Sequence, residues 1–320
     1  MLEICAELSA NHNGSLERAL KIVDAAADAG ADLFKVQVWE PGTMCVDRSY
    51  VIPSGAWAGR RMFELYEEAW TPWEWLPDIF KRCRARGMEP FGAAFDNASV
   101  DYLESLGVKR HKVASFELVD LPLIRYMASK GKPVMLSTGM AARWEVQAAM
   151  AAALPNCFPL ACVSAYPSRP EDVVLRYWAD MFDDWGLSDH SLGCGVAAAA
   201  AALGATYIEK HLTLSRSDGG LDSGFSMEPA EFELMVETCH QAHDASQPNK
   251  RRPKPGGEND TMRRSLWVVK DTPAGARLVL GDNVRTARPA SGLPCYTPLD
   301  GKCAFKDLAA GTPLTLGDIA

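Results

Sequence analysis

The opening stretch of the chain, residues 2–39, reads LEICAELSANHNGSLERALKIVDAAADAGADLFKVQVW. It begins and ends with short apolar runs, at residues 2–8 and 33–39, which are typical of buried strands. Between them, residues 15–29 carry apolar side chains at helical spacing, with Ser15 as the expected N-cap and Gly30 as the stop signal. The stretch therefore predicts a strand, a helix and a second, parallel strand.

The same alternation continues as far as residue 213. Further strands are expected at residues 89–95, 111–117, 133–138, 158–166, 186–190 and 207–213. Helices are expected at residues 72–86, 98–106, 121–129, 143–153, 195–203 and 229–243. Eight strands within about 245 residues predict a (β/α)8 TIM barrel over residues 1–244. Residues 40–69 are too many for an ordinary loop, so we expect an insertion over the C-terminal face of this barrel.

The composition changes after residue 244. Residues 245–260 are rich in proline, glycine and basic side chains and are interpreted as a linker. Residues 261–320 contain short apolar pieces separated by glycine and proline, which is typical of a small β-rich domain. Such a domain has a small core, and we expect it to dock on another surface.

Composition excludes several classes of protein. The 320 residues are 48% hydrophobic and 23% charged with a net charge of −8, which is typical of a globular protein and argues against a nucleic-acid partner. No apolar segment approaches the roughly 18 residues of a membrane span. The nine cysteines are dispersed and contain no C-x-x-C pair, so reduced thiols and a cytoplasmic location are expected.

Two lysines lie in strands that are otherwise apolar. Lys35 shares a face with Gln37, and a buried ammonium requires an anion, which is either a ligand or a structural salt-bridge partner. Strict alternation puts Lys112 on the opposite face from Ser115 and Glu117. A shared site for these three residues therefore requires a bulge or an earlier end to the strand.

Small hydroxyl side chains recur at the ends of the expected strands, where a barrel carries its active site. A single strand-end serine usually caps a turn, but a ring of serines around two lysines is a plausible phosphate cradle. Its members are Ser115, Ser137, Ser164 and Ser188, and Ser164 shares a strand face with Tyr166.

Two histidines end the seventh and eighth expected strands. His190 and His211 would reach the same rim from neighbouring strands, and two imidazoles are a common part of a divalent-metal site. A single histidine in a strand is more often structural. Glu7, beside the eighth strand in a closed barrel, would add an oxygen ligand directly or through water, or would simply cap the next loop.

Several segments resemble the sialic acid synthase family along essentially the whole chain. They are residues 6–14, 29–37, 136–140, 187–190 and 208–211 in the barrel, and residues 264–269 and 288–292 in the terminal domain. The resemblance implies a (β/α)8 barrel followed by a small SAF (antifreeze-like) domain. It also implies an enzyme that condenses phosphoenolpyruvate with an acetamido sugar and releases phosphate.

Within the family, residues 65–73, 114–120 and 219–229 are most similar to the pseudaminic acid synthase branch. That branch implies 2,4-diacetamido-2,4,6-trideoxy-L-altrose as the acceptor, whereas the alternative branches make N-acetylneuraminate or legionaminic acid from another hexosamine. Ala93 departs from the family pattern, because relatives carry a hydroxyl residue there. One expected phosphate donor is thereby lost.

The resemblance also implies roles for individual residues. Glu117 is expected as general base or acid, and Arg288 is expected to reach the sugar of a partner subunit, which implies a domain-swapped homodimer. A divalent ion is expected on His190 and His211, with Mn²⁺ first and Mg²⁺ or Co²⁺ as alternatives. The sugar or metal-bound water would contact Glu7, Gln37, Tyr166 and Asp222, and phosphoenolpyruvate would contact Lys35, Lys112, Ser115, Ser137, Ser164 and Ser188.

Two other functions remain open. A metal-dependent aldolase that uses pyruvate would not need a phosphate cradle, so the serine ring argues against it. A catalytically silent sugar-phosphate sensor would not need His190, His211 and Glu117 together.

Overall fold

The computed structural model describes residues 2–247 and 259–320. The chain divides into two compact units, Met1–Gln247 and Pro248–Ala320. Most of the predicted linker, residues 248–258, lies outside the described residues. Within the described ranges, no helix combines the length and the apolar character needed to cross a membrane.

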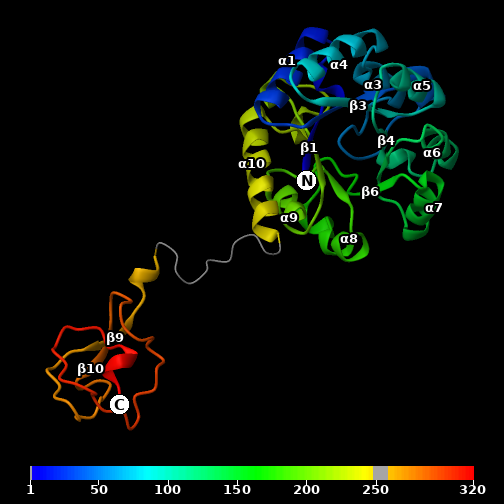
Figure 1. Ribbon diagram of the computed structural model, residues 1–320. Helices are drawn as coiled ribbons and strands as arrows, with labels where there is room; N and C mark the ends of the chain where they lie inside the picture. Colours follow the sequence, from blue (N-terminus) through cyan, green and yellow to red (C-terminus); the bar gives the residue numbers. More distant parts are fainter. Residues whose placement is uncertain (1, 248–258) are drawn as a thin grey trace. The chain divides into compact units, whose positions relative to one another are not determined.

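The first unit is a closed barrel of parallel strands in sequence order, with helices on its outside (Figure 1). The predicted TIM barrel is therefore confirmed. The strands are β1 (Glu3–Glu7), β2 (Leu33–Val38), β3 (Glu89–Ala94), β4 (His111–Val113), β5 (Val134–Ser137), β6 (Cys157–Cys162), β7 (Gly186–Asp189) and β8 (Tyr207–His211).

The helices include those expected from the sequence, with ends that differ by a few residues. The insertion at residues 40–69 contributes two further helices, α2 and α3. The full set is α1 (Leu16–Asp28), α2 (Pro41–Met44), α3 (Met62–Ala69), α4 (Leu76–Ala85), α5 (Asn97–Ser105), α6 (Leu121–Ala128), α7 (Arg143–Ala153), α8 (Leu175–Met181), α9 (Gly195–Ala202) and α10 (Pro229–Ser246).

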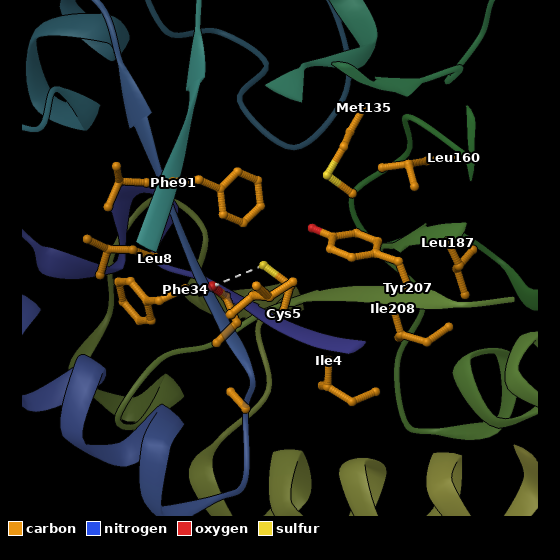
Figure 2. Packing of buried hydrophobic residues seen from close by; sticks show 14 of the residues in the cluster. Ile4, Cys5, Leu8, Phe34, Phe91, Met135, Leu160, Leu187, Tyr207 and Ile208 are labelled. Carbon is orange, nitrogen blue, oxygen red and sulfur yellow. Dashed lines mark hydrogen bonds between the residues drawn. The ribbon is translucent and has the colours of Figure 1, made fainter. Parts of the chain in front are cut away.

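Alternation along the strands builds the core. Ile4 and Ile208 point toward the surrounding helices, whereas Cys5, Met135 and Tyr207 converge inside the barrel (Figure 2). All five side chains are almost completely buried, and full burial of an aliphatic or aromatic side chain stabilises a fold by about 1.5–3 kcal/mol. The interior is therefore a packed core, and it supports the residues at the C-terminal ends of the strands.

Three local expectations were wrong. The fourth strand was expected to reach residue 117 but ends at Val113, and a 3-10 turn, Ser115–Glu117, follows it. The sixth strand was expected to reach residue 166 but ends at Cys162, which is its last residue in register with β7. Helix α8 was not expected, because Leu175 is its only buried residue and so it lacks an apolar stripe.

The second unit is small and rich in loops. Its two named strands, β9 (Ser265–Val268) and β10 (Val284–Ala287), pair antiparallel. A separate apolar cluster fills it, made by Leu266, Val268, Leu278, Val284, Leu299, Ala304, Leu308 and Leu314. The predicted small β-rich domain is thus confirmed, and Arg288 lies in it directly after β10.

Candidate active site

A cavity of about 840 Å³ opens where the barrel strands end. Its lining joins residues that are far apart in the sequence. Two of the predicted site residues do not line it: Glu7 is fully buried in a pair with Lys35, and Arg288 belongs to the second unit. The predicted residues that do line it are Lys35, Gln37, Lys112, Ser115, Glu117, Ser137, Ser164, Tyr166, Ser188, His190, His211 and Asp222.

Lys35 is held by two carboxylates. Its Nζ lies 2.6 Å from Glu7 Oε2 and 3.4 Å from Glu209 Oε1, and all three side chains are buried. Although burial disfavours the ammonium, Glu209 and Glu7 raise the pKa of Lys35 above its ordinary value. Burial raises the pKa of Glu7 in turn. The salt-bridge partners that the sequence left open are therefore present in the protein itself.

Lys112 has different surroundings. Its Nζ donates to Ser137 Oγ at 2.6 Å and to the Val113 carbonyl oxygen at 3.0 Å. Among the residues that the structure describes, no carboxylate forms an ion pair with it. Burial lowers the pKa of Lys112, since nothing close by compensates fully for the lost hydration. This is the cation of the cavity that an anionic ligand would stabilise most.

The early end of β4 brings Ser115 into the site. The chain turns after Val113, so Lys112 and Ser115 line the same cavity, and the earlier strand end rather than a bulge resolves the alternation problem. Ser115 Oγ and Ser164 Oγ are 2.6 Å apart. Gly139, at φ 51°, makes this approach possible, because a Cβ there would lie 2.5 Å from Ser115 Cβ and from Ser164 Oγ.

His190 and His211 lie side by side, with ring centroids 5.3 Å apart. His190 Nδ1 donates to the Val163 carbonyl oxygen at 2.9 Å, which leaves the lone pair on Nε2. His211 Nδ1 is buried and has no hydrogen-bond partner in the described part of the chain. Two such imidazoles fit a divalent ion. Since the described residues contain no cluster of three or more His, Cys, Asp or Glu able to hold one, water or substrate would complete the ligand set.

Glu117 projects from the turn after β4 into the cavity. Its Oε2 is buried without a hydrogen-bond partner within the described ranges. Burial raises its pKa to about 7. A carboxyl group with that pKa exchanges a proton readily near neutral pH, as a general acid or base requires.

The insertion forms an apolar wall of the cavity, as expected from its place in the sequence. Trp57 donates its indole N–H to the Leu221 carbonyl oxygen at 3.2 Å and packs 5.3 Å from the Tyr166 ring. Tyr166 in turn lies 4.4 Å from the His190 ring. Other lining residues from the insertion are Met44, Ile52, Met62, Leu65 and Tyr66.

Sequence reasoning missed several polar residues of the cavity, and two of them, Glu209 and Ser9, contact predicted site residues. Glu209 accepts from Ser188 Oγ at 3.1 Å and from Tyr207 Oη at 2.7 Å. It shares the inward face of β8 with His211, and the period of two in that strand is a signal that identifies it. Ser9, in the turn after β1, contacts Gln37 and Asp222, and no comparable pattern marks it.

Comparison with known proteins agrees with this architecture. The NeuB family model matches residues 22–251 and the SAF domain model matches residues 263–320. A pseudaminic acid synthase from Campylobacter jejuni subsp. jejuni serotype O:2 is 37% identical over 98% of this chain and 96% of its own length. An N,N'-diacetyllegionaminic acid synthase from Legionella pneumophila is 31% identical over 97% of this chain and 92% of its own.

Among solved structures, the N-acetylneuraminic acid synthetase of Leptospira borgpetersenii superposes with a TM-score of 0.72. It is 28% identical and covers 79% of this chain and 87% of its own. Both the barrel and the terminal domain are therefore accounted for by one set of relatives. The chain belongs to the NeuB family and ends in a SAF domain.

Proposed function

We propose that this chain is a pseudaminic acid synthase. It condenses phosphoenolpyruvate with 2,4-diacetamido-2,4,6-trideoxy-L-altrose to a nine-carbon 3-deoxy-2-ulosonic acid and releases phosphate. The higher identity to a pseudaminic than to a legionaminic acid synthase supports this choice of acceptor. The observation that carries the reaction class is the meeting of Lys112, the serine ring and the paired histidines in one cavity.

Phosphoenolpyruvate suits the part of the cavity that is lined by Lys112 and the serine ring. Of the two lysines that line the cavity, Lys112 is the one without a carboxylate partner within the described ranges, and Ser137 is already within hydrogen-bond distance of it. Ser115 and Ser164 add two hydroxyl groups in the space that Gly139 leaves free. Charge-assisted hydrogen bonds to phosphate are about twice as strong as neutral ones, so this group of donors favours the enol phosphate over pyruvate.

The paired histidines suit the aldehyde end of the sugar. We propose that His190 and His211 hold a divalent ion, Mn²⁺ first with Mg²⁺ or Co²⁺ as alternatives. When bound, such an ion supplies Lewis-acid polarisation of a carbonyl oxygen. The hydrogen bond from His190 Nδ1 to the Val163 carbonyl oxygen keeps that ring in one tautomer and orientation.

Glu117 is assigned to proton transfer. C3 of the enol forms the new bond to the aldehyde carbon, and the aldehyde oxygen takes a proton and becomes a hydroxyl group. A water oxygen adds to C2 while Glu117 takes one of its protons, which replaces the proton given to the aldehyde oxygen. The bond from C2 to the phosphate oxygen then breaks as C2 becomes a ketone, and the proton of the C2 hydroxyl group leaves with the phosphate. Burial of Glu117 supports this role, because a pKa of about 7 allows the carboxylate to accept that proton near neutral pH.

We further propose that the active unit is a cytoplasmic, domain-swapped homodimer in which Arg288 completes the site of a neighbouring chain. The family resemblance supports this arrangement. The length of chain between residues 247 and 257 also allows it, since it would span roughly 30 Å if extended.

The proposal is tested by measuring phosphate release with phosphoenolpyruvate, Mn²⁺ and a panel of acetamido hexoses, followed by mass spectrometry of the product. We expect turnover with the diacetamido-trideoxy-altrose and at least about tenfold lower kcat/KM with N-acetylmannosamine. Preference for another acceptor would assign the chain to a different branch of the family. Phosphate release that does not depend on any sugar would contradict the proposal.

A further inference from the structure

Ser9 combines a costly backbone conformation with a central place in the cavity wall. It lies in the 3-10 turn Ser9–His12 directly after β1, and its φ is 45°. Residues with a side chain rarely adopt positive φ, and where they do so beside a cavity the conformation is often maintained for function. The Ser9 side chain lines the cavity and is 5% exposed.

The hydroxyl group of Ser9 joins two residues that the family resemblance assigns to the sugar or to metal-bound water. Ser9 Oγ donates to Asp222 Oδ2 at 2.5 Å, and Gln37 Nε2 donates to Ser9 Oγ at 3.1 Å. The backbone contributes as well, because Ala10 N donates to Asp222 Oδ2 at 3.3 Å. One hydroxyl therefore links the end of β2 with the loop after β8, across the turn that follows β1.

We propose that Ser9 is a positioning residue for the acceptor sugar, acting through Gln37 and Asp222. This inference rests on the proposed function. The Gln37 amide donates one N–H to Ser9 Oγ, and a hydrogen bond from Gln37 also acts to lower the pKa of Glu7, so the amide oxygen is the group that remains to accept a hydrogen bond. Both hydrogen bonds to Asp222 from this turn end on Oδ2, so they leave Oδ1 unused.

The chemistry of this cluster distinguishes the two substrates. The atoms of Gln37 and Asp222 that this turn leaves free are hydrogen-bond acceptors, and one of them belongs to a carboxyl side chain. Such a cluster attracts the hydroxyl and amide N–H groups of an acetamido sugar, whereas it repels the phosphate and carboxylate of phosphoenolpyruvate. Loss of Ser9 should therefore weaken the use of the sugar and spare phosphoenolpyruvate.

A purely structural role for Ser9 makes the opposite prediction. If the hydroxyl only braced the turn, its removal would lower stability and affect both substrates alike. Glycine separates the two roles, because it adopts positive φ without strain while it removes the hydroxyl. The same turn offers a matched control in Asn13, which has φ 47° and donates to the Gly219 carbonyl oxygen but does not line the cavity.

The experiment compares Ser9→Gly, Ser9→Ala and Asn13→Gly with the wild-type full-length chain. Initial rates are measured with each substrate varied in turn at saturating Mn²⁺, and melting temperatures are recorded. For both Ser9 variants we expect kcat/KM for the sugar to fall about 10- to 100-fold, as for the loss of a hydrogen bond to a charged group. We expect KM for phosphoenolpyruvate to change by less than about twofold.

Stability should separate the variants further. Ser9→Gly should melt at or above the wild-type temperature, and Ser9→Ala below Ser9→Gly, because alanine keeps the strained φ. Asn13→Gly should leave both kinetic constants unchanged. If the wild-type enzyme is active but Ser9→Gly has unaltered sugar kinetics, the role of Ser9 is overturned and the proposed function stands. A melting temperature of Ser9→Gly clearly below that of the wild type would have the same consequence. A wild-type enzyme without sugar-dependent turnover would overturn the proposed function and the sugar assignment with it.

Discussion

Replacing each buried lysine by methionine tests how the cavity divides its charges. Lys35 is paired with Glu7 and Glu209, whereas Lys112 has only hydroxyl and carbonyl partners within the described residues. Methionine keeps much of the side-chain volume and removes the charge. We therefore expect Lys35→Met mainly to destabilise the fold and Lys112→Met mainly to weaken phosphoenolpyruvate.

The magnitudes follow from the surroundings. Lys35→Met leaves two buried carboxylates facing each other, and breaking a buried pair in this way costs about 3–5 kcal/mol. At about 2–4 °C per kcal/mol, the melting temperature should fall by roughly 6–20 °C. Lys112→Met removes a buried charge that has no carboxylate partner among the described residues, so stability should change by less than about 1 kcal/mol. Loss of one charge-assisted contact to phosphate, about 1.5–3 kcal/mol, should raise KM for phosphoenolpyruvate about 10- to 150-fold.

The assay is phosphate release with either substrate varied, together with thermal melting of each purified variant. Lys109→Met is the matched control, because Lys109 is exposed and its 3.5 Å pair with Glu89 should contribute at most about 1 kcal/mol. Equal losses of stability in Lys35→Met and Lys112→Met would refute the division of roles. So would a Lys112→Met enzyme whose KM rises equally for the sugar and for phosphoenolpyruvate.

Three further predictions concern the metal, the proton and the partner chain. His190→Ala and His211→Ala should each abolish turnover and keep the wild-type circular dichroism spectrum, and a chelator should abolish the turnover of the wild type without changing its spectrum. Near-normal rates in any of these samples would exclude the metal role. kcat/KM should rise with pH through about 7, because the carboxylate form of Glu117 is the base, and Glu117→Gln should lose that limb; an unchanged limb would assign it to another group. Arg288→Ala and His190→Ala chains, each inactive alone, should regain activity when refolded together, whereas inactive mixed dimers would place Arg288 outside the partner's site.

The barrel was predictable because its signal is repeated along the chain. Each strand is a short apolar run, and most helices carry an apolar stripe, so an error at one boundary does not alter the fold. The exceptions confirm the cause. Helix α8 buries only Leu175 and lacks the apolar stripe, so no periodic signal predicts it. Strand β4 ends at Val113, where the chain turns, and the residue types of HKVASFE contain no signal for that turn.

From spacing alone, the site was predictable where its residues stand on strands or in the turns just after them, whereas Asp222 was expected only from the family resemblance. Lys35, His190 and His211 occupy inward positions near strand ends, so topology alone brings them together. Ser9 differs, because its partner Asp222 lies 213 residues away in a loop and its φ is a property of the folded turn. A contact between two loops has no period in the sequence, and only the folded chain identifies it.

The distribution of charge explains why the cavity can hold an anionic substrate beside two carboxylates. Lys35 lies between Glu7 and Glu209, and despite burial the two lysines lower the pKa of Glu209 to about 2. That carboxylate is therefore ionised at neutral pH and is neutralised by cations on its own side of the barrel. Burial raises the pKa of Glu7, so Glu7 resists carrying a second full negative charge there. Lys112, in contrast, donates to Ser137 in the serine ring and forms no ion pair with a carboxylate in the described structure. A phosphate bound at Ser115 and Ser164 would therefore be attracted by a cation that no carboxylate neutralises through direct pairing.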